Sequence, residues 1–395
     1  MLRTSVNFTS LGLSPIVEIS ERAAAIAPEF EKETGQPFIY FQRGEIGFDT
    51  PAYITNAFCE AVTIKKLTKY PKSGGYQWFK DAVIAHLKEI GISDIHRDNV
   101  VATHGGQEGL ELAILQIAPQ ARVASFGPIW SCMLENILPY AQASLEMIPL
   151  NLENLEIDYI KLDQVLSRSD VLYINTPHNP TGKVFKHNEL ETINTLCKKH
   201  NVFIISDEAY KDIVFGVKHT SMLEFEGDHI ISIFTGSKSF AATGLRMGYA
   251  VSRNRSFIEG MTRGNYTQTA GLAGPQQYAL ASALNLVDQR TEWLNSFIGE
   301  LYERRSILYA GLSKYFDKVH CPEGGFYFWI NCNSFLNGKG DKHLVDTLLN
   351  NGVAVVHGSA FGAGYEGYVR LSFSTIDKTT LRHAPSQLMN AMRKL

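Results

Sequence analysis

Two positive charges, Lys238 and Arg246, stand among small residues in the stretch TGSKSFAATGLRMGY at 235–249. The stretch directly follows the apolar run at 230–234, which has the pattern of a buried strand. Burying a charged lysine is costly unless the amine is paired or neutral. A desolvated lysine near other positive charge has a lowered pKa and can act as a nucleophile. An ordinary surface lysine at the end of a strand is the alternative interpretation.

Four other predicted strands are also followed by groups that could do chemistry: an anion cradle, a flat ring, an amide, and a carboxylate with a phenol. These are the first two glycines of HGGQEGL (104–110), Trp130 in GPIWSCM (127–133), Asn179 in TPHNPTG (176–182), and Asp207 with Tyr210 in SDEAYKD (206–212). Taken singly, each has a structural explanation: a turn, a core aromatic, a tight loop or a helix N-cap.

Together these groups indicate one ligand. In an open α/β sheet, ligands bind at the carboxyl ends of the strands. Five neighbouring strand ends would therefore gather a phosphate cradle, a ring platform, an amide, a carboxylate and a lysine. That set suits a phosphorylated, planar, nitrogen-containing aromatic aldehyde. The lysine would bind the aldehyde, and the carboxylate would keep the ring nitrogen protonated so that the ring can accept electrons.

The elements that must position these groups follow from the hydrophobic pattern. Six β-branched runs alternate with amphipathic segments, at 99–103, 122–126, 171–175, 202–206, 230–235 and 249–252. Continuous apolar strands separated by helices indicate a mostly parallel sheet covered on both faces. Near the C-terminus, closely spaced strands in GGFYFWIN, GVAVVHG and YVRLSFS predict a smaller α+β domain. The segment before about residue 45 is expected to pack with it.

Composition narrows the class of protein. The chain has 395 residues, of which 45% are hydrophobic and 19% charged, so it is long enough for two domains and a large core. A net charge of −3 gives no general attraction to nucleic acid or to an anionic membrane. The five cysteines and twelve histidines lack metal-ligand spacing. We therefore expect no metal site, no membrane segment or signal peptide, and a reduced cytoplasmic protein.

Seven motifs, in order along nearly the whole chain, resemble those of the fold-type I pyridoxal-phosphate enzymes. Within that group the chain is similar to the class I/II aminotransferases related to aspartate aminotransferase. The motifs are RGEIGFDTP (43–51), KYPKSGGYQWFKDAV (69–83), NTPHNPTGKVF (175–185), SDEAYKDIVF (206–215), TGSKSFAATGLRMGYA (235–250), CPEGGFYFWI (321–330) and YVRLSFST (368–375). The resemblance implies an α/β large domain at 46–290, with a mostly parallel seven-stranded sheet flanked by helices. It also implies a smaller α+β domain from 1–45 and 291–395.

The resemblance implies three catalytic residues and a substrate site. Lys238 would bind pyridoxal 5′-phosphate covalently and carry a proton between the substrate Cα and the cofactor C4′. Asp207 would pair with the ring nitrogen, while Tyr210 and Asn179 would donate hydrogen bonds to the ring 3-oxygen. Arg370 would hold the substrate α-carboxylate in a bidentate fork. The further implied site groups are the Asn179 amide and the Gly44 backbone beside the substrate carboxylate.

The resemblance also assigns residues to the phosphate and the ring. The implied phosphate cup consists of Arg246, Thr235, Ser237 and the backbone amides of Gly106 and Gln107. Trp130 would stack on the ring, and the peptide before Pro180 would be cis. Tyr70 matches the tyrosine that reaches the phosphate of a neighbouring subunit, which implies a homodimer.

The implied activity is ping-pong transfer of an amino group between an L-amino acid and a 2-oxo acid. Another pyridoxal-phosphate reaction on this fold is an alternative: a β-elimination lyase, a decarboxylase or a cyclising synthase. A non-catalytic binding protein and a nicotinamide-dependent dehydrogenase are further alternatives. The dehydrogenase lacks support, because no G-x-G-x-x-G follows the first strand.

The identity of the amino donor stays open. Arg22, Arg43 and Arg263 are candidates for the second cation that a dicarboxylic donor needs, and Ile46 and Gly47 depart from the family pattern at the substrate mouth.

Overall fold

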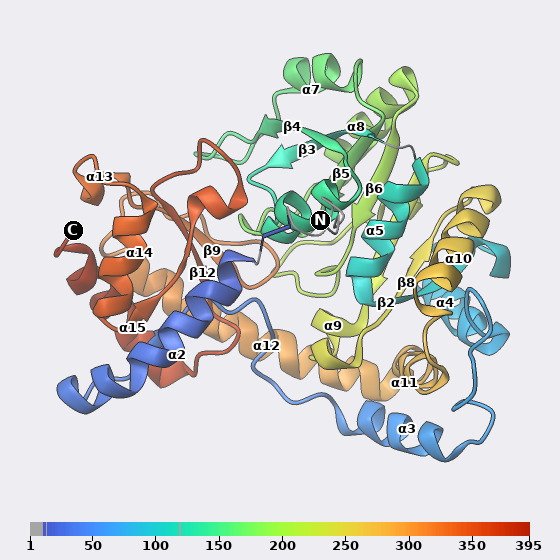
Figure 1. Cartoon of the computed structure of the whole chain (residues 1–395), viewed down its shortest axis with the longest axis horizontal. Coiled ribbons are helices and arrows are strands. Elements are labelled where there is room, and N and C mark those ends of the chain that lie inside the picture. Colours follow the sequence, from blue (N-terminus) through green and yellow to red (C-terminus); the bar gives the residue numbers. More distant parts are fainter. Residues whose placement is uncertain (1–10, 13, 118–119) are drawn as a thin grey trace, which may run out of the picture.

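A seven-stranded sheet forms the centre of the larger part of the molecule (Figure 1). The computed structural model describes residues 11–12, 14–117 and 120–395. The strands are β2 (Val100–His104), β3 (Arg122–Gly127), β4 (Ser144–Pro149), β5 (Val171–Asn175), β6 (Phe203–Asp207), β7 (Ile230–Thr235) and β8 (Met247–Val251). Their order is β2-β8-β7-β6-β5-β3-β4. Strand β8 alone runs opposite to the other six strands of this sheet, so the prediction of a mostly parallel sheet is confirmed.

Strand β4 has no counterpart among the six runs found in the sequence. It lies at the edge of the sheet and pairs only with β3. Ile148 is its one buried residue, and Ser144 and Pro149 are exposed. An edge strand that is partly solvated does not need a continuous apolar run, so its sequence carries a weak strand signal.

Alternate side chains of each strand enter two separate cores, one on each face of the sheet. On one face Leu172 and Ile174 pack in a core that also includes residues of α4 (Gln77–Glu89), α7 (Tyr159–Leu166), α8 (His187–His200) and α11 (Gly274–Asn285). On the other face Val171 and Tyr173 pack with residues of α5 (Gly105–Ile117) and α10 (Arg255–Thr269). The expected covering of both faces is therefore confirmed.

The smaller group of elements joins the two ends of the described chain. An antiparallel sheet has the order β11-β12-β9, and a two-stranded parallel sheet pairs β1 with β10. The strands are β1 (Ile39–Tyr40), β9 (Tyr327–Asn331), β10 (Val353–Ala354), β11 (Val356–His357) and β12 (Tyr368–Ser372). The helices around them are α2 (Pro15–Thr34), α14 (Asp341–Asn350) and α15 (Lys378–Met392). Pairing of Ile39 with Val353 shows that the N-terminal segment packs with the C-terminal part, as expected.

One long helix connects the two groups. Helix α12 (Val287–Leu312) extends from the larger group, where it contacts α11, to the smaller group, where it packs against α15 (Figure 1). The predicted domain boundary at residue 290 falls inside this helix, so the division into 46–290 and 1–45 with 291–395 stays a prediction.

Among residues 11–12, 14–117 and 120–395, none of the helices combines the length and the hydrophobicity needed to cross a bilayer. No three His, Cys, Asp or Glu side chains of these residues gather as metal ligands. All five cysteines are free thiols.

Replacing Gly248 on β8 by alanine should destabilise the fold. A Cβ at Gly248 would lie 2.7 Å from the carbonyl carbon of Gly105 and 2.8 Å from the carbonyl oxygen of Phe234. Both neighbours are backbone atoms that cannot rotate away, so we expect the free energy of unfolding to fall by about 1–3 kcal/mol in a urea titration. The matched control is Gly299→Ala in α12, where no atom lies within 4 Å of the new Cβ. It should raise that free energy by about 0.5–1 kcal/mol. Equal stability of the two variants would contradict the close approach of β8 to the start of α5.

Candidate active site

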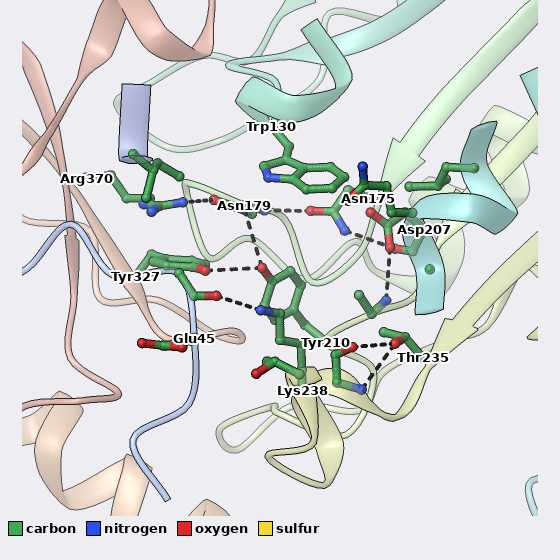
Figure 2. A pocket seen from close by; sticks show the side chains of 18 of the residues that line it. Glu45, Trp130, Asn175, Asn179, Asp207, Tyr210, Thr235, Lys238, Tyr327 and Arg370 are labelled. Atoms are coloured by element: carbon green, nitrogen blue, oxygen red, sulfur yellow. Dashed lines mark hydrogen bonds between the residues drawn. The ribbon is translucent and has the colours of Figure 1, made fainter. Parts of the chain in front are cut away.

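A cavity of about 300 Å³ lies where the carboxyl ends of the parallel strands meet (Figure 2). This is the edge at which open α/β sheets bind their ligands. Every site residue predicted from the sequence lines the cavity, except Tyr70. The lining members are Gly44, Gly106, Gln107, Trp130, Asn179, Asp207, Tyr210, Thr235, Ser237, Lys238, Arg246 and Arg370.

Lys238 lies on the short helix α9 (Gly236–Ser239), which begins directly after β7. Its Nζ donates a hydrogen bond to the carbonyl oxygen of Gly44 at 2.6 Å, across 194 residues of sequence. It forms no ion pair with any residue in the described part of the chain. Burial and the nearby Arg370 lower the pKa of Lys238 from 10.5 to about 8. The amine is therefore partly neutral near pH 8, as a nucleophile requires.

Asp207 is the last residue of β6 and is buried at the back of the cavity. Its Oδ2 accepts a hydrogen bond from the Tyr173 hydroxyl at 2.9 Å, and its Oδ1 accepts one from the Ala209 N–H at 3.1 Å. Burial raises the pKa of Asp207 to about 6, whereas the hydrogen bond from Tyr173 acts in the opposite direction. A protonated ring nitrogen beside this carboxylate would further favour its ionised form.

Asn179 and Tyr210 form a hydrogen-bonded pair in the middle of the site (Figure 2). The Asn179 amide donates to the Tyr210 hydroxyl at 3.4 Å, and that hydroxyl lies 3.2 Å from the hydroxyl of Tyr327. The Asn179–Pro180 peptide is cis, as expected. Burial raises the pKa of Tyr210 well above its ordinary value, so its phenol stays protonated and can donate.

Groups that favour an anion gather at the other end of the cavity. Helix α5 begins there, and the N–H groups of its first residues have no partner within the helix. The Arg246 side chain lies against this helix end. If Gly105 carried a Cβ, that atom would lie only 3.0 Å from Arg246 Nη2. The Thr235 and Ser237 hydroxyls, 2.9 Å apart, also line the cavity. A guanidinium, two hydroxyls and a helix N-terminus together suit a phosphate group.

Arg370 is a buried cation without a carboxylate partner in the described part of the chain. It lies on β12 and is only 1% exposed. Its Nη1 donates to Asn179 Oδ1 at 3.2 Å and its Nη2 to the Gln42 carbonyl at 3.0 Å, while its Nε has no hydrogen-bond partner. Burying a charge without a counter-ion is costly. The arrangement therefore indicates that an anionic ligand completes the site.

Tyr70 and the three arginines considered for a second cation do not line this cavity. Tyr70 is 90% exposed. Arg22 forms an ion pair with Asp346, and Arg263 one with Glu259 on its own helix. The Arg43 guanidinium lies 4.5 Å from the centre of the Tyr40 ring.

Several lining residues were missed by sequence reasoning. They are Ile16, Glu45, Leu110, Asn175, Ala209, Thr243 and Tyr327. Asn175 had a visible signal, because it is a polar residue at the very end of an apolar strand. Its Oδ1 accepts the Asn179 N–H at 2.7 Å and its Nδ2 donates to the Asp207 carbonyl at 3.0 Å. This amide therefore joins the ends of β5 and β6. Tyr327 had no such signal, because it stands among three other aromatic residues.

The donor set fits pyridoxal phosphate. The anion-binding end suits its phosphate, the lysine its aldehyde, the carboxylate its ring nitrogen and the indole of Trp130 its flat ring. Figure 2 shows Trp130 and Lys238 on opposite sides of the row of side chains that runs from Arg370 to Asp207. The cavity volume lies at the lower end of the range for small-molecule sites.

Comparison with known proteins points to the same chemistry. The family model described as aminotransferase class I and II matches residues 37–388. The probable aspartate aminotransferase of Methanocaldococcus jannaschii is 30% identical over 338 residues, which cover 84% of this chain and 88% of that relative. The aspartate aminotransferase of Thermotoga maritima is 30% identical over 379 residues, 94% of each chain. The solved structure of a double mutant of the Thermus thermophilus aspartate aminotransferase matches with a TM-score of 0.90 and 24% identity, over 99% of this chain and 100% of that one.

The structural match confirms the fold, and the family match covers most of the chain. Members of this family are generally dependent on pyridoxal phosphate. The protein is an enzyme, and it belongs to the class I and II aminotransferases.

Proposed function

We propose that the protein uses pyridoxal 5′-phosphate to move an amino group between an L-amino acid and a 2-oxo acid by a ping-pong mechanism. The observation that carries the proposal is Arg370, a buried guanidinium with an unpartnered Nε on the wall of the cavity that also holds Lys238. Amino acids and 2-oxo acids share an α-carboxylate, an anion that a guanidinium can bind through two parallel hydrogen bonds.

When bound, the cofactor supplies a protonated aromatic ring that accepts the electrons released at the substrate Cα. The chain offers a matching group for each part of it. We assign the phosphate to Arg246, Thr235, Ser237 and the amides of Gly106 and Gln107, the ring nitrogen to Asp207, the 3-oxygen to Asn179 and Tyr210, and one ring face to Trp130.

Lys238 has two tasks in this proposal. Its neutral amine holds the cofactor covalently when no substrate is present. Once an amino acid occupies the site, the freed Nζ would be the base that takes the proton from the substrate Cα and the acid that later gives it back. Arg370 holds the α-carboxylate, with the Gly44 backbone beside it, and this limits how Cα can turn relative to Lys238. The constraint favours loss of the Cα proton over loss of the carboxylate.

We also propose a homodimer in which Tyr70 reaches the phosphate of a second copy of the chain. The Tyr70 side chain is 90% exposed and does not line the cavity of the chain to which it belongs, and both facts support this role. The five free thiols suit a reducing compartment, and we propose the cytoplasm.

A half-reaction tests the proposed function. Purified protein loaded with pyridoxal phosphate is mixed with single amino acids, including aspartate and neutral and aromatic donors, without any 2-oxo acid. We expect one equivalent of the matching 2-oxo acid per subunit, and further turnover only after a second 2-oxo acid is added. Release of ammonia or CO₂ with every donor would instead indicate a lyase or a decarboxylase, the alternatives that the family match does not favour.

The pKa of Lys238 predicts how cofactor uptake depends on pH. Because burial lowers this pKa to about 8, the amine is mostly charged below pH 7 and mostly neutral above pH 9. The rate at which the apoprotein takes up pyridoxal phosphate should therefore rise about tenfold per pH unit below the pKa and level off above it. Stopped-flow absorbance between pH 6 and 11 measures this. A midpoint near 10.5, the ordinary lysine value, would show that Lys238 is not desolvated.

A further inference from the structure

Tyr173 is a buried tyrosine on β5 that none of the assignments above uses. Its side chain is 1% exposed, and its neighbours along the strand, Leu172 and Ile174, are aliphatic. A phenol in an apolar core normally requires a hydrogen-bond partner. The identity of that partner shows what the hydroxyl does.

The strand register determines the partner. Tyr173 is paired with Ile205 on β6, and Asp207 lies two residues further along that strand. Residues two apart in a strand point to the same face of the sheet, so Asp207 is a diagonal neighbour within reach of an aromatic side chain. The Tyr173 hydroxyl accordingly lies 2.9 Å from Asp207 Oδ2.

The direction of this hydrogen bond is determined as well. Burial raises the pKa of Tyr173 well above its ordinary value, so the phenol keeps its proton and donates it. An ionised carboxylate can only accept. With Oδ1 held by the Ala209 N–H, Asp207 is fixed through both oxygens.

We propose that Tyr173 is a positioning residue that keeps Asp207 ionised and oriented toward the ring nitrogen of the cofactor. This inference rests on the proposed function, because the role of Asp207 depends on it. Tyr173 itself touches neither cofactor nor substrate in this scheme, since it does not line the cavity.

The charges around Asp207 show why a dedicated donor matters. Burial is the largest influence on its pKa and favours the neutral acid, and the neighbouring Glu208 acts in the same direction. The hydrogen bond from Tyr173 is the strongest opposing influence, ahead of the Ala209 N–H and Lys238. On the Tyr173 side, Tyr210 and Cys132 are the other titratable groups that face the pair. Without the phenol, the carboxylate would therefore lose its main support for the charged form.

The first measurement uses the apoprotein. Carboxyl ¹³C NMR of protein labelled at aspartate follows Asp207 through pH, with Asp207→Asn used to assign its signal. We expect a midpoint near pH 6 in the wild type. In Tyr173→Phe the midpoint should be higher by about one pH unit or more, since a charge-assisted hydrogen bond is lost. An unchanged midpoint would overturn the inference without affecting the proposed function.

The second measurement uses the loaded enzyme. In Tyr173→Phe we expect kcat to fall about 10- to 100-fold while KM for the amino acid changes less than about threefold. The acidic limb of the pH profile of kcat should move to higher pH, because a raised pKa requires a higher pH for ionisation. A variant that is merely less well packed would lose activity without this shift. Tyr249→Phe is the matched control, since it removes a phenol that is 2% exposed on β8 and outside the cavity.

A double-mutant cycle isolates the pair. In an Asp207→Asn background residue 207 carries no negative charge that the Tyr173 hydroxyl could stabilise, so Tyr173→Phe should change kcat less than about twofold. Tyr173→Leu also removes the hydroxyl and provides the same comparison if the phenylalanine variant does not fold. Full additivity of the two substitutions would refute the coupling. Failure of the wild-type half-reaction would instead refute the proposed function, whatever the Tyr173 variants show.

Discussion

Lys238→Ala is expected to lower kcat by roughly four orders of magnitude or more, because it removes both the covalent anchor and the proton carrier. The loss should appear in kcat rather than in KM, since Arg370 still holds the substrate carboxylate. Cofactor should still bind through its phosphate and ring. Borohydride reduction followed by peptide mass mapping gives an independent readout. It should attach the cofactor to Lys238 in the wild type and to no lysine of the variant.

The control for this variant is Lys218→Ala. The Lys218 side chain is 83% exposed and lies 3.8 Å from Glu224, and it does not line the cavity. Its removal should leave kcat within a factor of about two. Turnover in Lys238→Ala at the wild-type rate, or borohydride labelling at another lysine, would overturn the assignment of the amine.

Arg370→Lys is expected to lower kcat/KM for amino acids by roughly 100-fold or more. Lysine keeps the positive charge but lacks the planar fork that binds a carboxylate through two parallel hydrogen bonds. It also leaves Asn179 Oδ1 and the Gln42 carbonyl without one of their donors. The comparison with a simple primary amine is decisive. Such an amine has no carboxylate for Arg370 to bind, so its slow half-reaction should proceed at similar rates in the wild type and the variant.

Arg263→Lys provides the matched control for the guanidinium. The Arg263 side chain is 80% exposed on α10 and pairs with Glu259, and it was one of the candidates for a second cation. We expect its kcat/KM to stay near the wild-type value. If Arg370→Lys slowed the simple amine as much as the amino acid, the arginine would serve the structure of the site rather than the substrate carboxylate.

Both effects depend on contacts between distant parts of the chain. Lys238 bonds to the Gly44 carbonyl, and Arg370 bonds to Asn179 and to the Gln42 carbonyl. A change in the packing of the N-terminal segment would therefore alter the lysine and the arginine together. The site is a property of both groups of elements joined by α12.

The sequence alone was sufficient for the local features. The apolar runs of the interior strands β5, β6 and β7 were visible because a strand buried on both faces needs continuous hydrophobic residues. The groups at their ends, such as Asp207 and Lys238, could be placed in one site because parallel strands end at the same edge of a sheet. Motif order then identified the family, which the comparisons confirmed.

The tertiary structure decided what depends on register and on contacts between distant segments. The hydrogen bond from Tyr173 to Asp207 left no pattern in the sequence. The partly exposed β4 left only a weak strand signal, and the polar residue Asn175 at the end of β5 did not show that its side chain would bond to the Asp207 carbonyl. Strand pairing sets which side chains become diagonal neighbours, and a shift of one residue would turn Tyr173 to the opposite face. The position of Arg370 beside Asn179 likewise depends on packing between elements 191 residues apart, which local propensity does not encode.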